Sequence, residues 1–282
     1  MMSPVFAVLV YLGEIPDLDI IVIGVIIVFA GYTSVYALND IVGYKDDIKK
    51  IRNNRRYSGL VDLDSVFVRH PLAQGYIRLK SAVWWAACWG GVALTGAYYL
   101  NPVCVLIFLS AALLEVGYCL LLKITFLRIL FSGFVKTAGP IAAIFAVDPS
   151  PEPVLPILIF VFHFLWEAGG QNIPNDYTDM EEDKLLKAKT LPIQFDRKIT
   201  CWLVVTLLIG AFLTTSAIFF YAPIVFNTIA FVILIVGSLL FLIIPALRLT
   251  ITNNNREAMI LFNKASYYPL FLSTLVTVII VI

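Results

Sequence analysis

Charged residues are scarce in this sequence, whereas apolar residues are abundant. Asp, Glu, Lys and Arg make up 14% of the 282 residues, hydrophobic residues make up 60%, and the mean hydropathy is +0.91. Soluble domains carry about 25% charged residues, so this composition excludes a soluble globular domain. The sequence also lacks the segments of about ten residues with alternating hydrophobicity that build outer-membrane barrels. We therefore expect an all-α integral membrane protein.

Cysteines are also few, and nothing in their spacing indicates a chemical role. The four cysteines lie in or at the end of apolar stretches and none forms a CxxC pair, so neither a zinc site nor a disulfide framework is indicated. The basic run KKIRNNRR (49–56) has aspartates on both sides, which argues against a nucleic-acid partner. This run suits a patch for the headgroups of membrane lipids or a lid over a cavity.

Apolar stretches recur along the whole sequence. A helix needs about 20 residues to cross the hydrocarbon of a bilayer, and most of the stretches approach that length. The nine predicted spans are 1–12, 18–39, 81–100, 102–122, 126–147, 153–172, 200–220, 223–246 and 261–282. The first is too short to cross alone, so we expect a short or truncated helix there. The pattern predicts a single transmembrane domain over residues 1–282, a nine-helix bundle around a central cavity open to the cytoplasmic side.

The connections between the spans alternate in character. Those after the second, fourth, sixth and eighth spans are long or polar: 40–80, 123–125, 173–199 and 247–260. The others are short and contain no Lys or Arg: 13–17, 101, 148–152 and 221–222. Because cytoplasmic loops are enriched in Lys and Arg, the first set is predicted to face the cytoplasm. The prediction is a multi-pass protein of the cell membrane with a cytoplasmic N-terminus and an outward C-terminus.

Two of the predicted cytoplasmic loops, 40–80 and 173–199, carry the same acidic pattern. It reads NDIVGYKDD from Asn39 and NDYTDMEED from Asn175. One, four and eight residues after the Asn stand Asp40, Gly43 and Asp47 in the first motif, and Asp176, Asp179 and Asp183 in the second. At about 100° per residue, these positions share one arc of a helix face. Each motif can therefore present an edge of oxygen atoms to one cavity.

Carboxylates at this density repel one another unless a cation neutralises them. Oxygen ligands with no nearby His or Cys favour a hard ion such as Mg²⁺. Mg²⁺ keeps several waters and is commonly shared between protein carboxylates and substrate phosphates. Two carboxylate edges that face each other therefore suit a metal-bridged diphosphate, with the active site on the cytoplasmic side.

With these motifs, the sequence resembles the UbiA superfamily of intramembrane prenyltransferases. That family has nine transmembrane helices and two Asp-rich motifs, close to NDxxDxxxD and DxxxDxxxD, on the second and sixth helices. The segment NDYTDMEEDKLLKAKTLPI matches the second motif and its usual ending, HPLAQG (70–75) is similar to an RPLxSG element, and YCLLLK (118–123) is similar to a YSxxLK element. The resemblance covers essentially the whole sequence.

The resemblance implies Mg²⁺-dependent transfer of a prenyl group from a polyprenyl diphosphate to a lipophilic acceptor, an aromatic quinone precursor or a glycerol-phosphate lipid. The implied metal ligands are Asp40, Asp47, Asp179 and Asp183. The implied diphosphate contacts are Asn39, Arg69, His70, Lys123 and Asn175. The implied catalytic residues are Asp40 and Asp176, either of which could serve as base or orienter for the acceptor.

One further diphosphate contact, Lys136, is predicted from its position. It lies inside the fifth span, and an ionisable side chain at membrane depth usually faces a cavity or a partner. Glu115 and Glu167 also lie within spans and are candidate partners for Lys136 or for the acceptor.

The sequence departs from the family pattern at the first motif. Gly43 stands where the family usually has Asp, and His70 stands where it usually has Arg before Pro71. The segment between Asp47 and His70 is also long and rich in Arg. Three alternatives therefore stay open: phosphoribosyl transfer to a polyprenyl phosphate, an inactive member of the family, and a non-catalytic ion-binding membrane protein.

Overall fold

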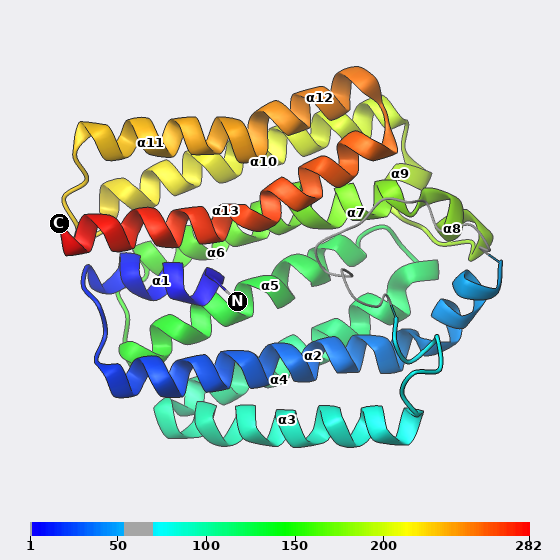
Figure 1. Cartoon of the computed structure of the whole chain (residues 1–282), viewed down its shortest axis with the longest axis horizontal. Helices are drawn as coiled ribbons and strands as arrows, with labels where there is room; N and C mark the ends of the chain where they lie inside the picture. The colour runs from blue at the N-terminus through cyan, green and yellow to red at the C-terminus, as the bar shows by residue number, and fades with distance from the viewer. Residues whose placement is uncertain (1, 54–69) are drawn as a thin grey trace.

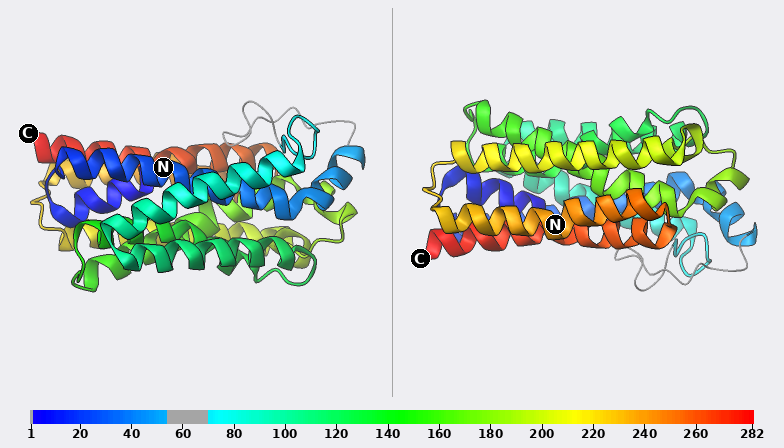
Figure 2. Two further views of the ribbon diagram at one scale, coloured as in Figure 1. Left: turned by 90° about the horizontal axis from the view of Figure 1, so that it is seen from below. Right: turned by 90° about the horizontal axis from the view of Figure 1, so that it is seen from above.

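The computed structural model describes residues 2–53 and 70–282, and all regular structure in these ranges is helical. The helices lie side by side as a long bundle (Figures 1 and 2). In order they are α1 (Met2–Leu12), α2 (Leu18–Asn53), α3 (Leu79–Leu100), α4 (Pro102–Leu120), η2 (Leu121–Lys123), α5 (Arg128–Val147), α6 (Val154–Trp166), η3 (Glu167–Asn172), α7 (Ile173–Thr178), α8 (Met180–Leu185), α9 (Leu191–Gln194), α10 (Arg197–Tyr221), α11 (Thr228–Ser238), η4 (Leu239–Ile243), α12 (Ile244–Thr252) and α13 (Asn255–Val281). The predicted all-α class is confirmed.

Seven helical segments in the described ranges are long and apolar enough to cross a membrane. They are Leu18–Ile51, Pro102–Lys123, Arg128–Val147, Val154–Thr178, Arg197–Tyr221, Thr228–Thr252 and Asn255–Val281. The protein is therefore a multi-pass membrane protein. The predicted count of nine crossings is not confirmed, because α1 has only 11 residues and α3, with 22 residues, contains Trp, Tyr and Gly that make it less apolar.

The ends of two predicted spans differ from the structure. The second span was predicted to end at residue 39, but α2 continues to Asn53. Lys49 and Asp46 form an i,i+3 ion pair at 3.2 Å on this extension, where polar helix-forming residues replace the apolar run. The sixth span continues beyond residue 172 through the π-helix η3 into α7. Both acidic motifs therefore begin on helices and not in loops.

The connections gather at the two ends of the bundle. The C-terminal end of α2, the turn before α3, and helices α8 and α9 lie at one end, and the C-terminus of the protein lies at the other (Figure 1). Helix α1 packs against α5 and α13, and α2 packs against α3 and α4. The two motif-bearing segments, α2 and α7–α8, thus reach the same end of the molecule.

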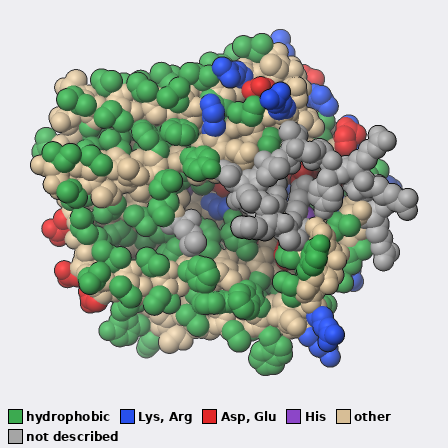
Figure 3. Space-filling view, viewed as in Figure 1, with side chains coloured by type: hydrophobic (Ala, Val, Ile, Leu, Met, Phe, Trp, Pro, Cys, Tyr) green, Lys and Arg blue, Asp and Glu red, His purple; other side chains and the backbone are tan. Residues whose placement is uncertain are grey.

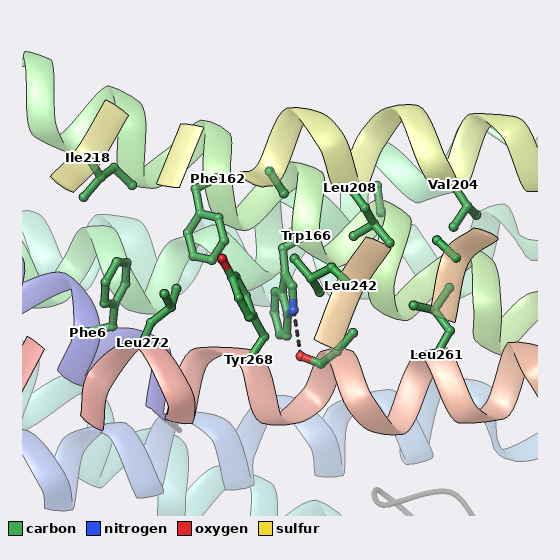
Figure 4. Packing of buried hydrophobic residues seen from close by; sticks show 14 of the residues in the cluster. Phe6, Phe162, Trp166, Val204, Leu208, Ile218, Leu242, Leu261, Tyr268 and Leu272 are labelled. Carbon is green, nitrogen blue, oxygen red and sulfur yellow. Dashed lines mark hydrogen bonds between the residues drawn. The ribbon is translucent and has the colours of Figure 1, made fainter. Parts of the chain in front are cut away.

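A buried apolar cluster joins α1 and α5 to the helices of the second half of the sequence (Figure 4). Trp166 of α6 donates a hydrogen bond from Nε1 to the Ala265 carbonyl of α13 at 2.9 Å. The hydroxyl groups of Tyr268 and Ser238 lie 2.7 Å apart, so this buried aromatic side chain has a polar partner. The face of the molecule seen in Figure 3 is largely apolar, as expected for side chains that face lipid.

Close packing around η3 requires the two glycines of its sequence EAGGQN. A Cβ atom at Gly170 would lie 2.9 Å from the Cβ atom of Ala265, and one at Gly169 would lie 2.9 Å from Leu207 Cβ. Real Cβ atoms do not approach so closely, and these neighbours are held by their own helices. The glycines therefore set the distance between the start of the second motif and helices α10 and α13.

Gly170→Ala is expected to destabilise the protein. Overpacking of a core position costs about 1–3 kcal/mol, so the thermal unfolding midpoint in detergent should fall. Gly24→Ala is the matched control, because a Cβ there has nothing within 4 Å and alanine is the better helix former. A Gly170→Ala protein as stable as the Gly24→Ala protein would contradict this packing constraint.

Candidate active site

The first motif brings together three side chains that could hold a metal ion. Asp40 and Asp47 lie on α2, and His70 begins the turn that leads to α3. One ligand atom from each of the three lies within 4.8 Å of the other two. His70 Nδ1 is 3.3 Å from Asp47 Oδ2 and 3.7 Å from Asp40 Oδ1. The sequence placed His70 near the phosphates, and the structure places its imidazole against the two carboxylates of this motif.

The second motif places its carboxylates in the protein interior. Asp176 lies on α7, Asp179 at the break between α7 and α8, and Asp183 on α8. Their exposed fractions are 5%, 9% and 2%. Ionised carboxylates are costly to bury unless cations and hydrogen bonds compensate them. The neighbours of these three groups therefore determine whether the site is stable.

Two cations from other helices supply the compensation. Arg128 of α5 is buried, and its Nη2 lies 2.6 Å from Asp176 Oδ1. The Arg128 guanidinium also lies over the Tyr118 ring, 4.4 Å from its centroid. Lys50 of α2 forms an ion pair with Asp183 at 3.0 Å. Lys50 thus joins the helix of the first motif to the helix of the second.

The predicted phosphate contact Lys123 lies at the same end of the bundle. It is the last residue of η2, and its Nζ donates to both carboxylate oxygens of Asp46 at 2.6 Å. Asp46 lies on α2 next to the motif residue Asp47. The Lys123 cation is therefore held beside the first carboxylate cluster.

The other predicted residues lie less close together. Asn39 donates from its amide to Glu115 of α4. Lys136 donates to the Tyr36 hydroxyl at 3.0 Å, farther along the bundle. Asn175 is half-buried on α7. Arg69 lies outside the described residues.

The two glutamates within the spans accept hydrogen bonds from uncharged side chains. Glu115 accepts the Asn39 amide, and Glu167 accepts a hydrogen bond from the Ser132 hydroxyl at 2.6 Å. These groups and Lys136 place polar side chains on α2, α4, α5 and η3 within the apolar bundle. Figure 3 shows a hollow beside the undescribed residues in which Lys or Arg and Asp or Glu side chains are visible.

Sequence reasoning missed Arg128, Lys50 and Asp46 as parts of the site. Arg128 carried a signal: it begins the fifth span eight residues before Lys136, so both lie on one face of α5. Lys50 and Asp46 carried none, because they lay in what was predicted to be a loop with many charges.

These features define a helical multi-pass membrane protein with two carboxylate clusters and several cations at one end of its bundle. The chain belongs to the UbiA prenyltransferase family, whose sequence model matches residues 1–275. The family resemblance and the predicted enzyme class, a UbiA-type prenyltransferase, are confirmed. No curated protein matches the sequence.

Several solved structures share the fold. An apo UbiA homolog from Aeropyrum pernix K1 is 17% identical, with a TM-score of 0.76 over 98% of this chain and 96% of that chain. A UbiA homolog from Archaeoglobus fulgidus bound to GPP and Mg²⁺ is 18% identical, with a TM-score of 0.65 over 100% and 95%. A digeranylgeranylglyceryl phosphate synthase is 18% identical, with a TM-score of 0.64 over 99% and 91%.

Loss of the Arg128 side chain should destabilise the protein strongly. Arg128→Met leaves the Asp176 carboxylate buried without its cation, which costs about 3–5 kcal/mol and should lower the thermal unfolding midpoint in detergent. The double variant Arg128→Met with Asp176→Asn should recover part of the loss, because the buried carboxylate that lost its counter-charge is also removed.

Lys184→Ala serves as the matched control for this prediction. It removes an exposed ion pair with Glu181 on α8, and such pairs contribute about 0–1 kcal/mol. Equal midpoints for Arg128→Met and Lys184→Ala would show that the Arg128–Asp176 pair does not support the fold.

Proposed function

We propose that this protein transfers a prenyl group from a polyprenyl diphosphate to a lipophilic acceptor inside the membrane, in a reaction that depends on Mg²⁺. The observation that carries the proposal is the meeting of two carboxylate clusters at one end of an apolar bundle. The ion pair between Lys50 of α2 and Asp183 of α8 joins the clusters. Family membership supplies the reaction class.

The residues present fit a divalent cation with oxygen ligands. Asp40 and Asp47 would hold it on α2, and Asp179 and Asp183 would hold it on the α7–α8 side. When bound, Mg²⁺ supplies Lewis-acid neutralisation of the leaving diphosphate. The Archaeoglobus fulgidus homolog, which shares the fold, has been solved with GPP and Mg²⁺, and this supports the same assignment here.

Cationic and amide side chains of the protein would bind the diphosphate around this site. Lys123 already donates to an α2 carboxylate, so a phosphate could replace that carboxylate as its partner. His70, whose Nδ1 lies against Asp47, could donate from Nε2 to the same phosphate. Asn39, Asn175 and Arg69 would add hydrogen bonds, and Lys136 would bind from α5. Fixed donors of this kind stabilise the negative charge that develops on the leaving group.

The apolar interior would hold the prenyl tail and exclude water from the allylic cation that forms as the C–O bond breaks. Asp40 and Asp176 are the candidates for base or orienter of the acceptor. Arg128 would keep the Asp176 carboxylate in one orientation through their 2.6 Å contact. The acceptor would be an aromatic quinone precursor or a glycerol-phosphate lipid.

The charged end of the bundle would face the cytoplasm. The loops at that end contain the Lys and Arg residues, whereas 13–17 and 148–152 at the opposite end contain only acidic charges. The positive-inside rule therefore supports a cytoplasmic N-terminus, an outward C-terminus and a central cavity open to the cytoplasm.

Diphosphate release by the purified protein tests the function. With geranyl, farnesyl or geranylgeranyl diphosphate and a panel of aromatic and glycerol-phosphate acceptors, release should require both Mg²⁺ and one acceptor. Asp179→Asn should lower kcat/KM by about 10²–10³-fold, because transition-state charge loses part of its stabilisation.

Glu181→Gln is the control, since Glu181 lies two residues away on α8 with its side chain 74% exposed, and its activity should match the wild type. If no acceptor supports release, although prenyl diphosphate binds with Mg²⁺, the proposal is wrong. Release from phosphoribosyl diphosphate with a polyprenyl phosphate would then identify the alternative reaction.

A further inference from the structure

We propose that His70 is a direct ligand of the divalent metal at the α2 carboxylates, where it takes the place of a carboxylate at position 43. The site would then contain a nitrogen ligand on the α2 side and only oxygen ligands on the α7–α8 side. This inference rests on the proposed metal-dependent function.

The first observation is the gap in the α2 motif. Gly43 lies between Asp40 and Asp47 on the same arc of the helix, and it has only a hydrogen atom as its side chain. A Cβ atom at Gly43 would lie 3.1 Å from Asp47 Oδ2. Position 43 therefore faces the same oxygen that the metal is expected to use, and a glycine there supplies no ligand of its own.

The second observation is that the imidazole approaches this same oxygen. His70 Nδ1 lies 3.3 Å from Asp47 Oδ2 and 3.7 Å from Asp40 Oδ1. Ligands of one divalent ion lie about 2.0–2.2 Å from it, and so roughly 3–4.4 Å from one another. The observed cluster, with its ligand atoms within 4.8 Å, needs only small side-chain movements to close around an ion.

The third observation is that a compact turn holds His70 in place. His70 has a φ of +54°, a conformation in which His is enriched among non-glycine residues. The turn is closed by hydrogen bonds from Gln74 N to His70 O at 3.0 Å and from Tyr76 N to Pro71 O at 3.0 Å. The buried side chain of Leu72 fixes it to the bundle.

An imidazole ligand changes which ions the site prefers. Carboxylate, carbonyl and water ligands suit Mg²⁺ and Mn²⁺, whereas imidazole suits later first-row ions such as Fe²⁺, Ni²⁺ and Zn²⁺. The site at α2 should therefore bind Ni²⁺ in preference to Mg²⁺ to a degree that an oxygen-only site does not. Asp179 and Asp183 offer only oxygen ligands, so the α7–α8 side should keep the preference of such ligands for Mg²⁺.

Pulsed EPR of Mn²⁺ added to the purified protein tests the proposal, with and without inorganic diphosphate. A coordinated imidazole gives a ¹⁴N modulation, and the sequence has only two histidines. The second, His163, is fully buried in α6, with Nδ1 2.8 Å from the Ile159 carbonyl. The wild type should show the ¹⁴N signal, and His70→Ala should lose it together with Mn²⁺ affinity at one site.

Two further variants separate coordination from simple positive charge. His70→Arg introduces a permanent cation but offers no lone pair, so it should also lack the ¹⁴N signal. His70→Ala combined with Gly43→Asp rebuilds an oxygen ligand, so it should regain Mg²⁺ affinity, with a lower ratio of Ni²⁺ to Mg²⁺ affinity than the wild type.

A wild-type protein without ¹⁴N modulation under either condition overturns the proposal, whatever the variants do. Equal metal affinity for the wild type and His70→Arg overturns it as well, and shows that His70 acts as a cation. Because no prenyl substrate is used, failure of the prenyltransferase assay leaves this result unaffected. Prenyl transfer without a ¹⁴N signal would refute the role of His70 alone.

Discussion

The constraint on which the rest of the structure depends is the pairing of buried carboxylates at the end of an apolar bundle. Asp176 and Asp183 are almost completely buried, and an unpaired charge there would cost several kcal/mol. Their counter-charges, Arg128 and Lys50, come from α5 and α2. Each ion pair therefore stabilises a local charge and also holds α7–α8 against another helix. In this way the same contacts support the fold and bring the two motifs to one site.

Much of the fold could be predicted because the membrane imposes a simple rule on the sequence. Each spanning helix must be apolar over most of its length, and this rule located all seven helices that are long and apolar enough to cross a membrane. The rule does not apply where a helix leaves the hydrocarbon, and so α2 was predicted to end 14 residues before Asn53. The rule also does not predict the π-helix η3, because the close approach of Gly170 to Ala265 involves a helix much later in the sequence.

The candidate site was predicted in part for a similar reason. The acidic positions of each motif follow from local helix geometry, and the structure brings Asp40 and Asp47 together as that geometry requires. The partners of these carboxylates depend on tertiary packing. Arg128 and Asp176, for example, are 48 residues apart, and no periodicity relates them. His70 was assigned to the phosphates by its place in a short element, but only the folded turn shows how close it lies to Asp47.

The central claim is that the two carboxylate clusters bind one metal–diphosphate unit together. Calorimetric titration with an unreactive thiolo analogue of geranyl diphosphate, with and without Mg²⁺, tests it most directly on the wild type, Asp47→Asn, Asp183→Asn and the double variant. The account predicts binding that requires Mg²⁺, a loss in each single variant, and a double loss well short of the sum, because residues of one unit are coupled. Binding that does not depend on Mg²⁺ would contradict the claim, and so would binding that is weakened by a change in only one of the two clusters.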